Sequence, residues 1–123
     1  MPDSSSIPRT KQGAAIIDGI HTDIVCTAFD DQTLLVITQY QKLGTLVQVT
    51  RDADLPEDRN TNFTSKVLLG KDEPLTHVYA TNIASKVCNT PNSKPLLLAM
   101  SLKQHSPAIL KTLQDLIMEY QVW

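Results

Sequence analysis

The histidines and cysteines are the side chains of this sequence most able to do chemistry. His21, His77 and His105 are far apart in the chain and lack the short spacings that metal ligands usually show. Cys26 lies within an apolar run that ends at Phe29, where a thiol is usually buried and inert. A hydrolase or thiol enzyme that uses Cys26 is therefore the least favoured function, and we expect no metal site.

The glycines and the paired carboxylates also form no catalytic motif. None of the four glycines lies in a GxGxxG or GxxxxGK frame that would hold a phosphate, and GxSxG and CxxC motifs are absent. Asp72 and Glu73 are adjacent acids, but they precede Pro74, and this order is typical of a helix start. The sequence therefore predicts a protein that is not an enzyme and that binds no cofactor.

The composition describes one domain and narrows the class of its partners. The 123 residues carry 11 basic and 13 acidic side chains, for a net charge of −2, and 41% of them are hydrophobic. This length suits a single domain with its own core. Nucleic acids and anionic membranes select basic surfaces, so the near-neutral balance argues against both as main partners.

The first dozen residues predict a flexible tail rather than a signal peptide. Segment 1–12 is polar, contains two prolines and three serines, and has no apolar centre. Without secretion, Cys26 and Cys88 are expected to be reduced and buried. We therefore assign residues 13–123 to a single domain and expect the protein in the cytoplasm, with diffusion into the nucleus left open.

The pattern after the tail predicts five strands, a helix, a strand and a final helix. One helix starts at Pro74 and runs for about fourteen residues, because apolar residues follow at three- and four-residue spacing. Ser106 and Pro107 start a second amphipathic helix that runs almost to Trp123. Gly44 marks a tight connection, so we expect the strands on either side of it to pair as a hairpin. Apolar and β-branched residues between turn residues place the strands at 14–18, 20–29, 33–41, 45–50, 63–70 and 95–103.

A mostly antiparallel six-stranded sheet with both helices on one face satisfies this order of elements. The central strands are apolar on both faces: Leu34 and Val36 alternate with Leu35 and Ile37, and the run 96–100 behaves alike. Two helices cover only one face. We therefore predict an α/β sandwich (α+β) whose other sheet face packs on a partner subunit across a two-fold axis. The alternative is a lone domain with a modest apolar patch.

The segment 51–62 is the best candidate for an interaction site. It is twelve residues long, polar and contains one proline, and loops of this length in compact domains are usually functional or disordered. Two interpretations stay open: a solvated surface loop, or a recognition arm that becomes ordered on a basic partner surface. The candidate partner-binding residues are one aliphatic side chain among charged ones: Arg51, Asp52, Asp54, Leu55, Glu57, Asp58 and Arg59.

Four segments of the chain resemble the proteasome assembly chaperone 3 family. They are VCTAF at 25–29, TQYQKLGTLV at 38–47, TSKVLLGKDEPLTHVYA at 64–80 and QVW at 121–123. The likeness follows the same order over nearly the whole chain after the tail. The matching positions that we expect to be structural are Gly44, Lys66, Gly70, Asp72, Glu73, Pro74 and Trp123.

The resemblance implies a function that the residues alone do not. Proteins of this family are non-enzymatic chaperones that bind α-type subunits of the 20S proteasome, promote assembly of the α-ring and dissociate before maturation. They act as homodimers or as heterodimers with proteasome assembly chaperone 4, and their fold is a six-stranded antiparallel sheet with helices. The runner-up is a small α/β adaptor module, of the longin or profilin type, in another cytosolic complex. The identity of the bound partner would distinguish the two.

Overall fold

The structure, a computed structural model, describes residues 9–39, 44–52, 63–88, 93–103 and 105–123. Its elements follow the predicted order of five strands, a helix, a strand and a helix. The strands are β1 (Arg9–Ile17), β2 (Ile20–Ala28), β3 (Thr33–Thr38), β4 (Thr45–Arg51), β5 (Phe63–Leu69) and β6 (Leu96–Ser101). The helices are α1 (Pro74–Val87) and α2 (Pro107–Glu119).

The first strand is longer than the sequence indicates. β1 begins at Arg9, so residues 9–12 pair with residues 25–28 of β2 and do not belong to a tail, which corrects the predicted boundary. Their side chains are exposed, and β1 lies at the edge of the sheet, where polar residues are common. The rest of the predicted tail, residues 1–8, lies outside the described residues.

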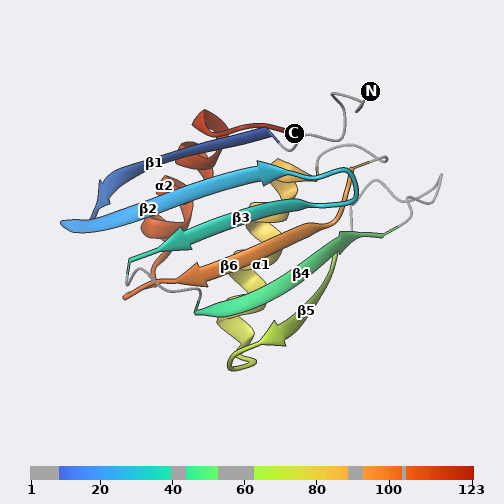
Figure 1. Cartoon of the computed structure of the whole chain (residues 1–123). Helices are drawn as coiled ribbons and strands as arrows, with labels where there is room; N and C mark the ends of the chain where they lie inside the picture. Colours follow the sequence, from blue (N-terminus) through green and yellow to red (C-terminus); the bar gives the residue numbers. More distant parts are fainter. Residues whose placement is uncertain (1–8, 40–43, 53–62, 89–92, 104) are drawn as a thin grey trace.

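The six strands form one mixed sheet in the order β1-β2-β3-β6-β4-β5 (Figure 1). β6 lies between β3 and β4 and runs parallel to β3, while the other neighbouring pairs are antiparallel. The hairpin expected between β3 and β4 is therefore wrong. β6 is aliphatic on both faces, which suits the centre of a sheet. The chain between β3 and β6 includes α1, which supplies the crossover that a parallel pair requires.

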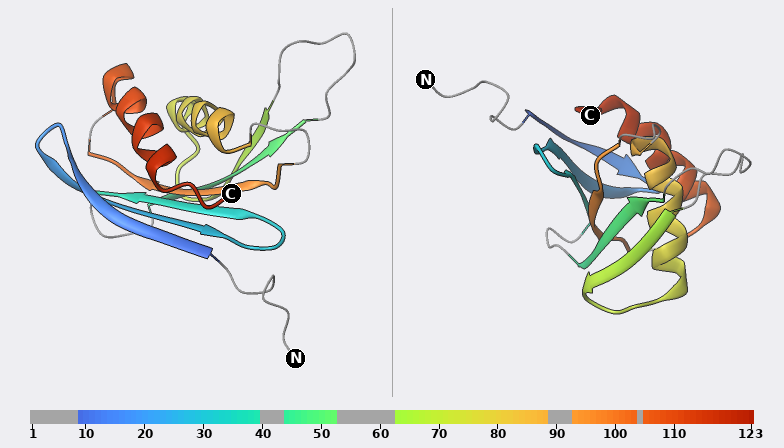
Figure 2. Two further views of the ribbon diagram at one scale, coloured as in Figure 1. Left: turned by 90° about the horizontal axis from the view of Figure 1, so that it is seen from above. Right: turned by 90° about the vertical axis from the view of Figure 1, so that its right-hand side faces the viewer.

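Both helices cover the same face of the sheet, as the left view of Figure 2 shows. α1 begins at Pro74 as predicted, and α2 begins after Ser106, whose side chain accepts a hydrogen bond of 3.1 Å from the Ile109 N–H. α2 ends at Glu119, short of the predicted end near Trp123. No helix in the described part of the chain has the length and apolar character to cross a membrane. The core joins the covered sheet face to both helices through Ile24, Leu35, Ile37, Val47, Val49, Leu96, Leu98, Ile83, Leu113 and Ile117.

Candidate protein-interaction site

The sheet face away from the helices carries a row of aliphatic side chains. Neither helix lies over it (Figure 2). Strand register aligns one residue from each of β2, β3, β6, β4 and β5 into a row, hereafter the apolar row: Val25, Val36, Ala99, Leu46 and Leu69. Leu34 and Leu97 are paired in the adjacent row on the same face.

Most of the apolar row remains accessible to solvent. Val25, Val36 and Leu46 are only half-buried, and Leu69 is 59% exposed, whereas Leu98 on the opposite face is fully buried. Ala99, at the centre of the row, is fully buried, so the accessible aliphatic side chains lie on either side of it. Aliphatic side chains left accessible together on one face are typical of a protein-contact site. The structure thus places aliphatic residues on both faces of the central strands, as the sequence predicts. The partner subunit that would cover the second face stays a prediction.

Polar residues border the apolar row. Asp23, Thr38 and Ser101 form the neighbouring register row on one side, and Gln48 pairs with Lys66 at the end of the other. Thr38 and Ser101 are themselves buried, so the accessible polar border is supplied by Asp23, Gln48 and Lys66. An apolar centre with a polar rim is the usual arrangement of a protein–protein interface. A hollow of about 470 Å³ also opens beside the row, where a side chain of a partner would fit; it is lined by Gln12, Gly13, Ala14, Asp23 and Val25.

Arg51 and Asp52 fix the base of segment 51–62. Arg51 pairs with Phe63 in the β4–β5 ladder, and its Nη1 donates a hydrogen bond of 3.1 Å to the Cys88 carbonyl at the C-terminal end of α1, where a cation is favourable. Asp52 accepts a hydrogen bond of 2.7 Å from the Thr64 hydroxyl. Both residues therefore hold the start of segment 51–62 to the folded domain, and we call these two residues its neck. The other predicted partner-binding residues lie outside the described residues and stay a prediction: Asp54, Leu55, Glu57, Asp58 and Arg59.

Two glycines of the family-like segments occupy positions that a side chain cannot easily enter. Gly44 has φ +67°, and a Cβ atom there would lie 2.4 Å from the Met100 carbonyl oxygen. Gly70 has φ +100°, and its Cβ would lie 3.0 Å from the Thr45 Cα. Left-handed backbone of this kind favours glycine. The predicted structural role of both positions thus has a physical reason, while Lys66 is exposed on β5.

A chain of hydrogen bonds joins β5 to the start of α1. His77 Nε2 lies 2.5 Å from the Asp72 carboxylate, and His77 Nδ1 lies 2.6 Å from Ser65 Oγ. Serine, histidine and aspartate in this order also form hydrolase triads, but a triad aspartate is buried, and the Asp72 side chain is 70% exposed. We interpret the three residues as a structural brace. The sequence predicted a hydrogen-bonded or solvent-facing His77 and missed Ser65, which lies twelve residues away.

The two cysteines are free, buried thiols, as the sequence predicts. Burial raises the pKa of Cys26 to about 11, although a backbone hydrogen bond from Val122 and the charge of Lys11 act in the opposite direction. Burial also raises the pKa of Cys88. Since the thiolate is the nucleophilic form, both side chains are poor nucleophiles near neutral pH. Among the described residues, no three metal-binding side chains gather at one place.

The chain is similar to known proteins over most of its length. The family model described as proteasome assembly chaperone 3 matches residues 35–120. A protein of that name from Nematostella vectensis is 44% identical, and the alignment covers 86% of this chain and 84% of the relative. Proteins of the same name from Bos taurus and Homo sapiens are 41% and 40% identical, and each alignment covers 93% of both chains.

The fold also has a counterpart among solved structures. A chain in the crystal structure of a chaperone complex for yeast 20S proteasome assembly superposes with a TM-score of 0.71. The superposition covers 92% of this chain and 97% of the other, at 18% sequence identity. At that identity the likeness concerns the fold, a six-stranded sheet with two helices.

Proposed function

The chain belongs to the proteasome assembly chaperone 3 family, and from this membership we propose that it acts as a chaperone in assembly of the 20S proteasome. The observation that carries the proposal is the match of the family model to residues 35–120. Relatives that share two-fifths or more of the sequence over nearly the whole chain support the same assignment.

We propose a non-enzymatic mode of action. The chain binds α-type subunits, promotes their assembly into the α-ring and leaves before the particle matures. It works in the cytoplasm. The poor nucleophilicity of the buried Cys26 thiol agrees with a role in binding rather than in covalent chemistry.

The working form in this proposal is a dimer that buries the apolar row. The polar border of the row and the hollow beside Val25 give this face the features of a contact surface. Two sheets pack well face to face when the strand directions of one sheet lie within about 30° of those of the other. The partner is a second copy of this chain or proteasome assembly chaperone 4.

The client side of the proposal is segment 51–62. Its neck is held by the contact between Arg51 and the Cys88 carbonyl and by that between Asp52 and Thr64. A fixed neck would present the acidic residues between 53 and 59 to a basic surface of an α-type subunit.

Reconstitution with purified proteasome subunits tests the chaperone role. The full chain is co-expressed with the complete set of α-type subunits, and the complexes are separated by native gel and weighed by mass spectrometry. We expect complexes of the chain with free α-type subunits, faster ring formation, and finished proteasomes that lack the chain. If no α-type subunit binds in any combination, with or without the related chaperone, the proposed function is wrong.

The dimer is tested by placing a charge in the apolar row. Val36→Lys should halve the particle mass in light scattering, because an unpaired ammonium group is costly in a closed apolar interface. Ser85→Lys adds the same charge on the exposed side of α1 and should leave the mass unchanged. Val25→Lys serves as a second row variant if Val36→Lys does not fold. Masses are measured for the chain alone and co-expressed with proteasome assembly chaperone 4, and a folded row variant that keeps the dimer mass of wild type in either sample would refute this dimer interface.

The client segment is tested with its neck kept intact. Asp54, Glu57 and Asp58 are replaced together by serine, while Asp52 keeps its hydrogen bond to Thr64. We expect weaker binding to α-type subunits and an unchanged dimer mass. Unchanged subunit binding would remove the segment from the proposal and leave the chaperone role standing.

A further inference from the structure

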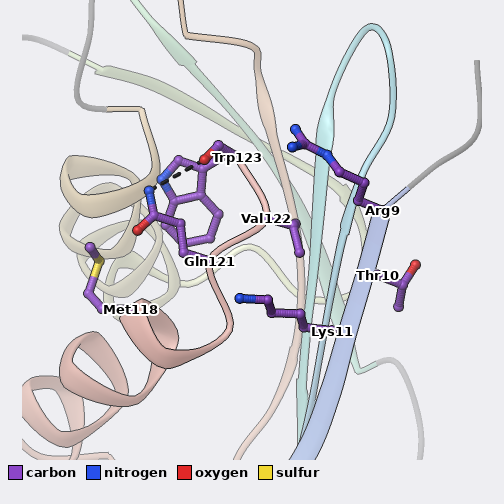
Figure 3. Close-up of a pocket in the computed structure, with 7 residues that line it drawn as sticks. All are labelled: Arg9, Thr10, Lys11, Met118, Gln121, Val122 and Trp123. Atoms are coloured by element: carbon purple, nitrogen blue, oxygen red, sulfur yellow. Dashed lines mark hydrogen bonds between the residues drawn. The ribbon is translucent and has the colours of Figure 1, made fainter. Parts of the chain in front are cut away.

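A groove between β1 and the C-terminal segment carries two cationic side chains, Arg9 and Lys11. The groove has a volume of about 470 Å³. Figure 3 shows the side chains that line it. Among the described residues, neither Arg9 nor Lys11 takes part in an ion pair. The protein as a whole has a net charge of −2, so a cationic groove is distinct from the average surface. The groove is lined by Arg9, Thr10, Lys11, Met118, Gln121, Val122 and Trp123.

The strand period places both cations on one side of β1. Arg9 and Lys11 are two residues apart, so their side chains leave the strand on the same face. Thr10, between them, points away from the groove in Figure 3 and bonds Thr27 on β2 at 3.0 Å. Lys11 pairs in register with Cys26 and acts electrostatically on that thiol, which places it on the helix side of the sheet.

The opposite wall of the groove combines apolar side chains with Gln121, whose amide donates a hydrogen bond of 3.4 Å to the Trp123 main-chain oxygen. Met118, in the last turn of α2, is 41% exposed. Val122 is buried, and Trp123 packs against the hydrophobic core, so the C-terminal segment is held in place. A ligand that fits both walls therefore needs negative charge on one side and an apolar group on the other.

The outer edge of β1 is also free for pairing. β1 is the first strand of the sheet, and within the described residues β2 is its only strand neighbour. The backbone groups that face away from β2 thus have no ladder partner there. Exposed edges of this kind accept an additional strand from another chain.

We propose that this groove docks an extended acidic segment of a proteasome α-type subunit, and this inference rests on the proposed function. The segment adds a strand to β1 and places alternate carboxylates against Arg9 and Lys11, because side chains two residues apart share one face of a strand. An apolar side chain two residues from one of these carboxylates lies on the same face of the segment and contacts Met118 and Trp123. A free phosphate would satisfy the two cations but would use neither the apolar wall nor the strand edge.

Charge reversal tests the groove. The full-length Arg9→Glu/Lys11→Glu variant is compared with Lys86→Glu/Lys111→Glu, which makes the same change in charge at exposed positions of α1 and α2. Affinities for individually purified α-type subunits are measured by biolayer interferometry at several salt concentrations. For at least one subunit we expect a loss of roughly tenfold or more, with weaker salt dependence, for the β1 variant only.

Photo-crosslinking locates the bound segment. A benzoylphenylalanine side chain at position 118 should crosslink to an α-type subunit, and mass spectrometry should identify a peptide with alternating acidic residues. Wild-type affinity of the β1 variant, or a crosslink to a peptide without acidic residues, would overturn the groove and leave the proposed function intact. If wild type binds no α-type subunit, both proposals fail. Circular dichroism confirms that each variant is folded.

Discussion

The two faces of the sheet are built from the same kinds of residue but differ in what covers them. Leu97 and Leu98 are neighbours in β6, yet Leu98 is fully buried under the helices and Leu97 is only half-buried on the open face. Val25 and Cys26 in β2 show the same contrast. An aliphatic side chain therefore does not by itself define a core position. The helices complete one face within the chain, and the other is available to a partner.

Truncating Leu97 and Leu98 of β6 in turn should give the largest difference between the faces. Leu98→Ala should cost about 2–5 kcal/mol of unfolding free energy, because it leaves a cavity in a closed core. Leu97→Ala removes the same atoms from a surface without cover and should cost about 1 kcal/mol or less in dilute protein. Urea unfolding followed by circular dichroism measures both.

Protein concentration supplies the control for this pair. If a partner copy covers Leu97, the cost of Leu97→Ala should grow with concentration, while that of Leu98→Ala should stay larger at every concentration. Equal costs in dilute protein would contradict the assignment of the two faces.

Thiol reactivity should separate the faces at Val25 and Cys26. Burial raises the pKa of Cys26 to about 11, so a very small fraction of it is thiolate at pH 8. A cysteine in Val25→Cys lies on the open face and should react with Ellman's reagent at least about a hundredfold faster than Cys26 in the folded wild type.

The same variant reports on the dimer. Dimer formation should slow the reaction of the introduced cysteine as concentration rises, because Val25 belongs to the apolar row. Fast reaction of Cys26 in folded wild-type protein would show that the helix face is open to solvent, which would contradict the comparison.

Local signals predicted the helix starts and the two-faced strands. Pro74 in the first turn of α1, and Ser106, whose side chain accepts a hydrogen bond from the Ile109 N–H, mark the two helix starts within one turn, whereas the Glu73 side chain makes no capping hydrogen bond. The alternating aliphatic pattern of β3 and β6 likewise indicated that one face needs cover from outside. These features depend on residues close together in the sequence, so a pattern can show them.

Features that depend on distant pairing escaped prediction. The position of β6 between β3 and β4 is set by packing of the whole sheet, not by the turn at Gly44. Residues 9–12 were assigned to the flexible tail because an exposed edge strand has no apolar pattern. Arg51 and Cys88, which are joined by a hydrogen bond, are 37 positions apart, and Ser65 and His77 are 12 positions apart. No local sequence spacing predicts either contact.

Alkaline pH should lower the free energy of unfolding through Cys26, which is buried on the sheet face that the helices cover. The folded chain holds the thiol proton until about pH 11, while the unfolded chain releases it near pH 9. This contribution to stability is therefore complete below pH 9 and is lost as pH rises toward 11, by about 2 kcal/mol. Between pH 8 and pH 10.5, wild type should lose that much more unfolding free energy than Cys26→Ala.

A buried residue that does not titrate provides the control for the pH series. Val87→Ala also removes buried apolar atoms and should follow the same pH profile as wild type, displaced by a constant amount. If the unfolding free energy of Cys26→Ala shows the same pH profile as that of wild type, burial does not raise the pKa of Cys26, and water reaches this face of the sheet.

The smallest contrast lies at the edge strand β5, between Ser65 and Lys66. Ser65→Ala removes the 2.6 Å hydrogen bond to His77 and should cost about 1 kcal/mol, because the brace to α1 loses one end. Lys66→Ala changes an exposed side chain of the open face and should fall within about 0.5 kcal/mol of wild type. Thermal unfolding in dilute protein measures both, with Asp72→Asn weakening the other end of the brace. Equal effects of Ser65→Ala and Lys66→Ala would mean that β5 is held by its ladder with β4 alone. The difference between the two faces would then end at β4.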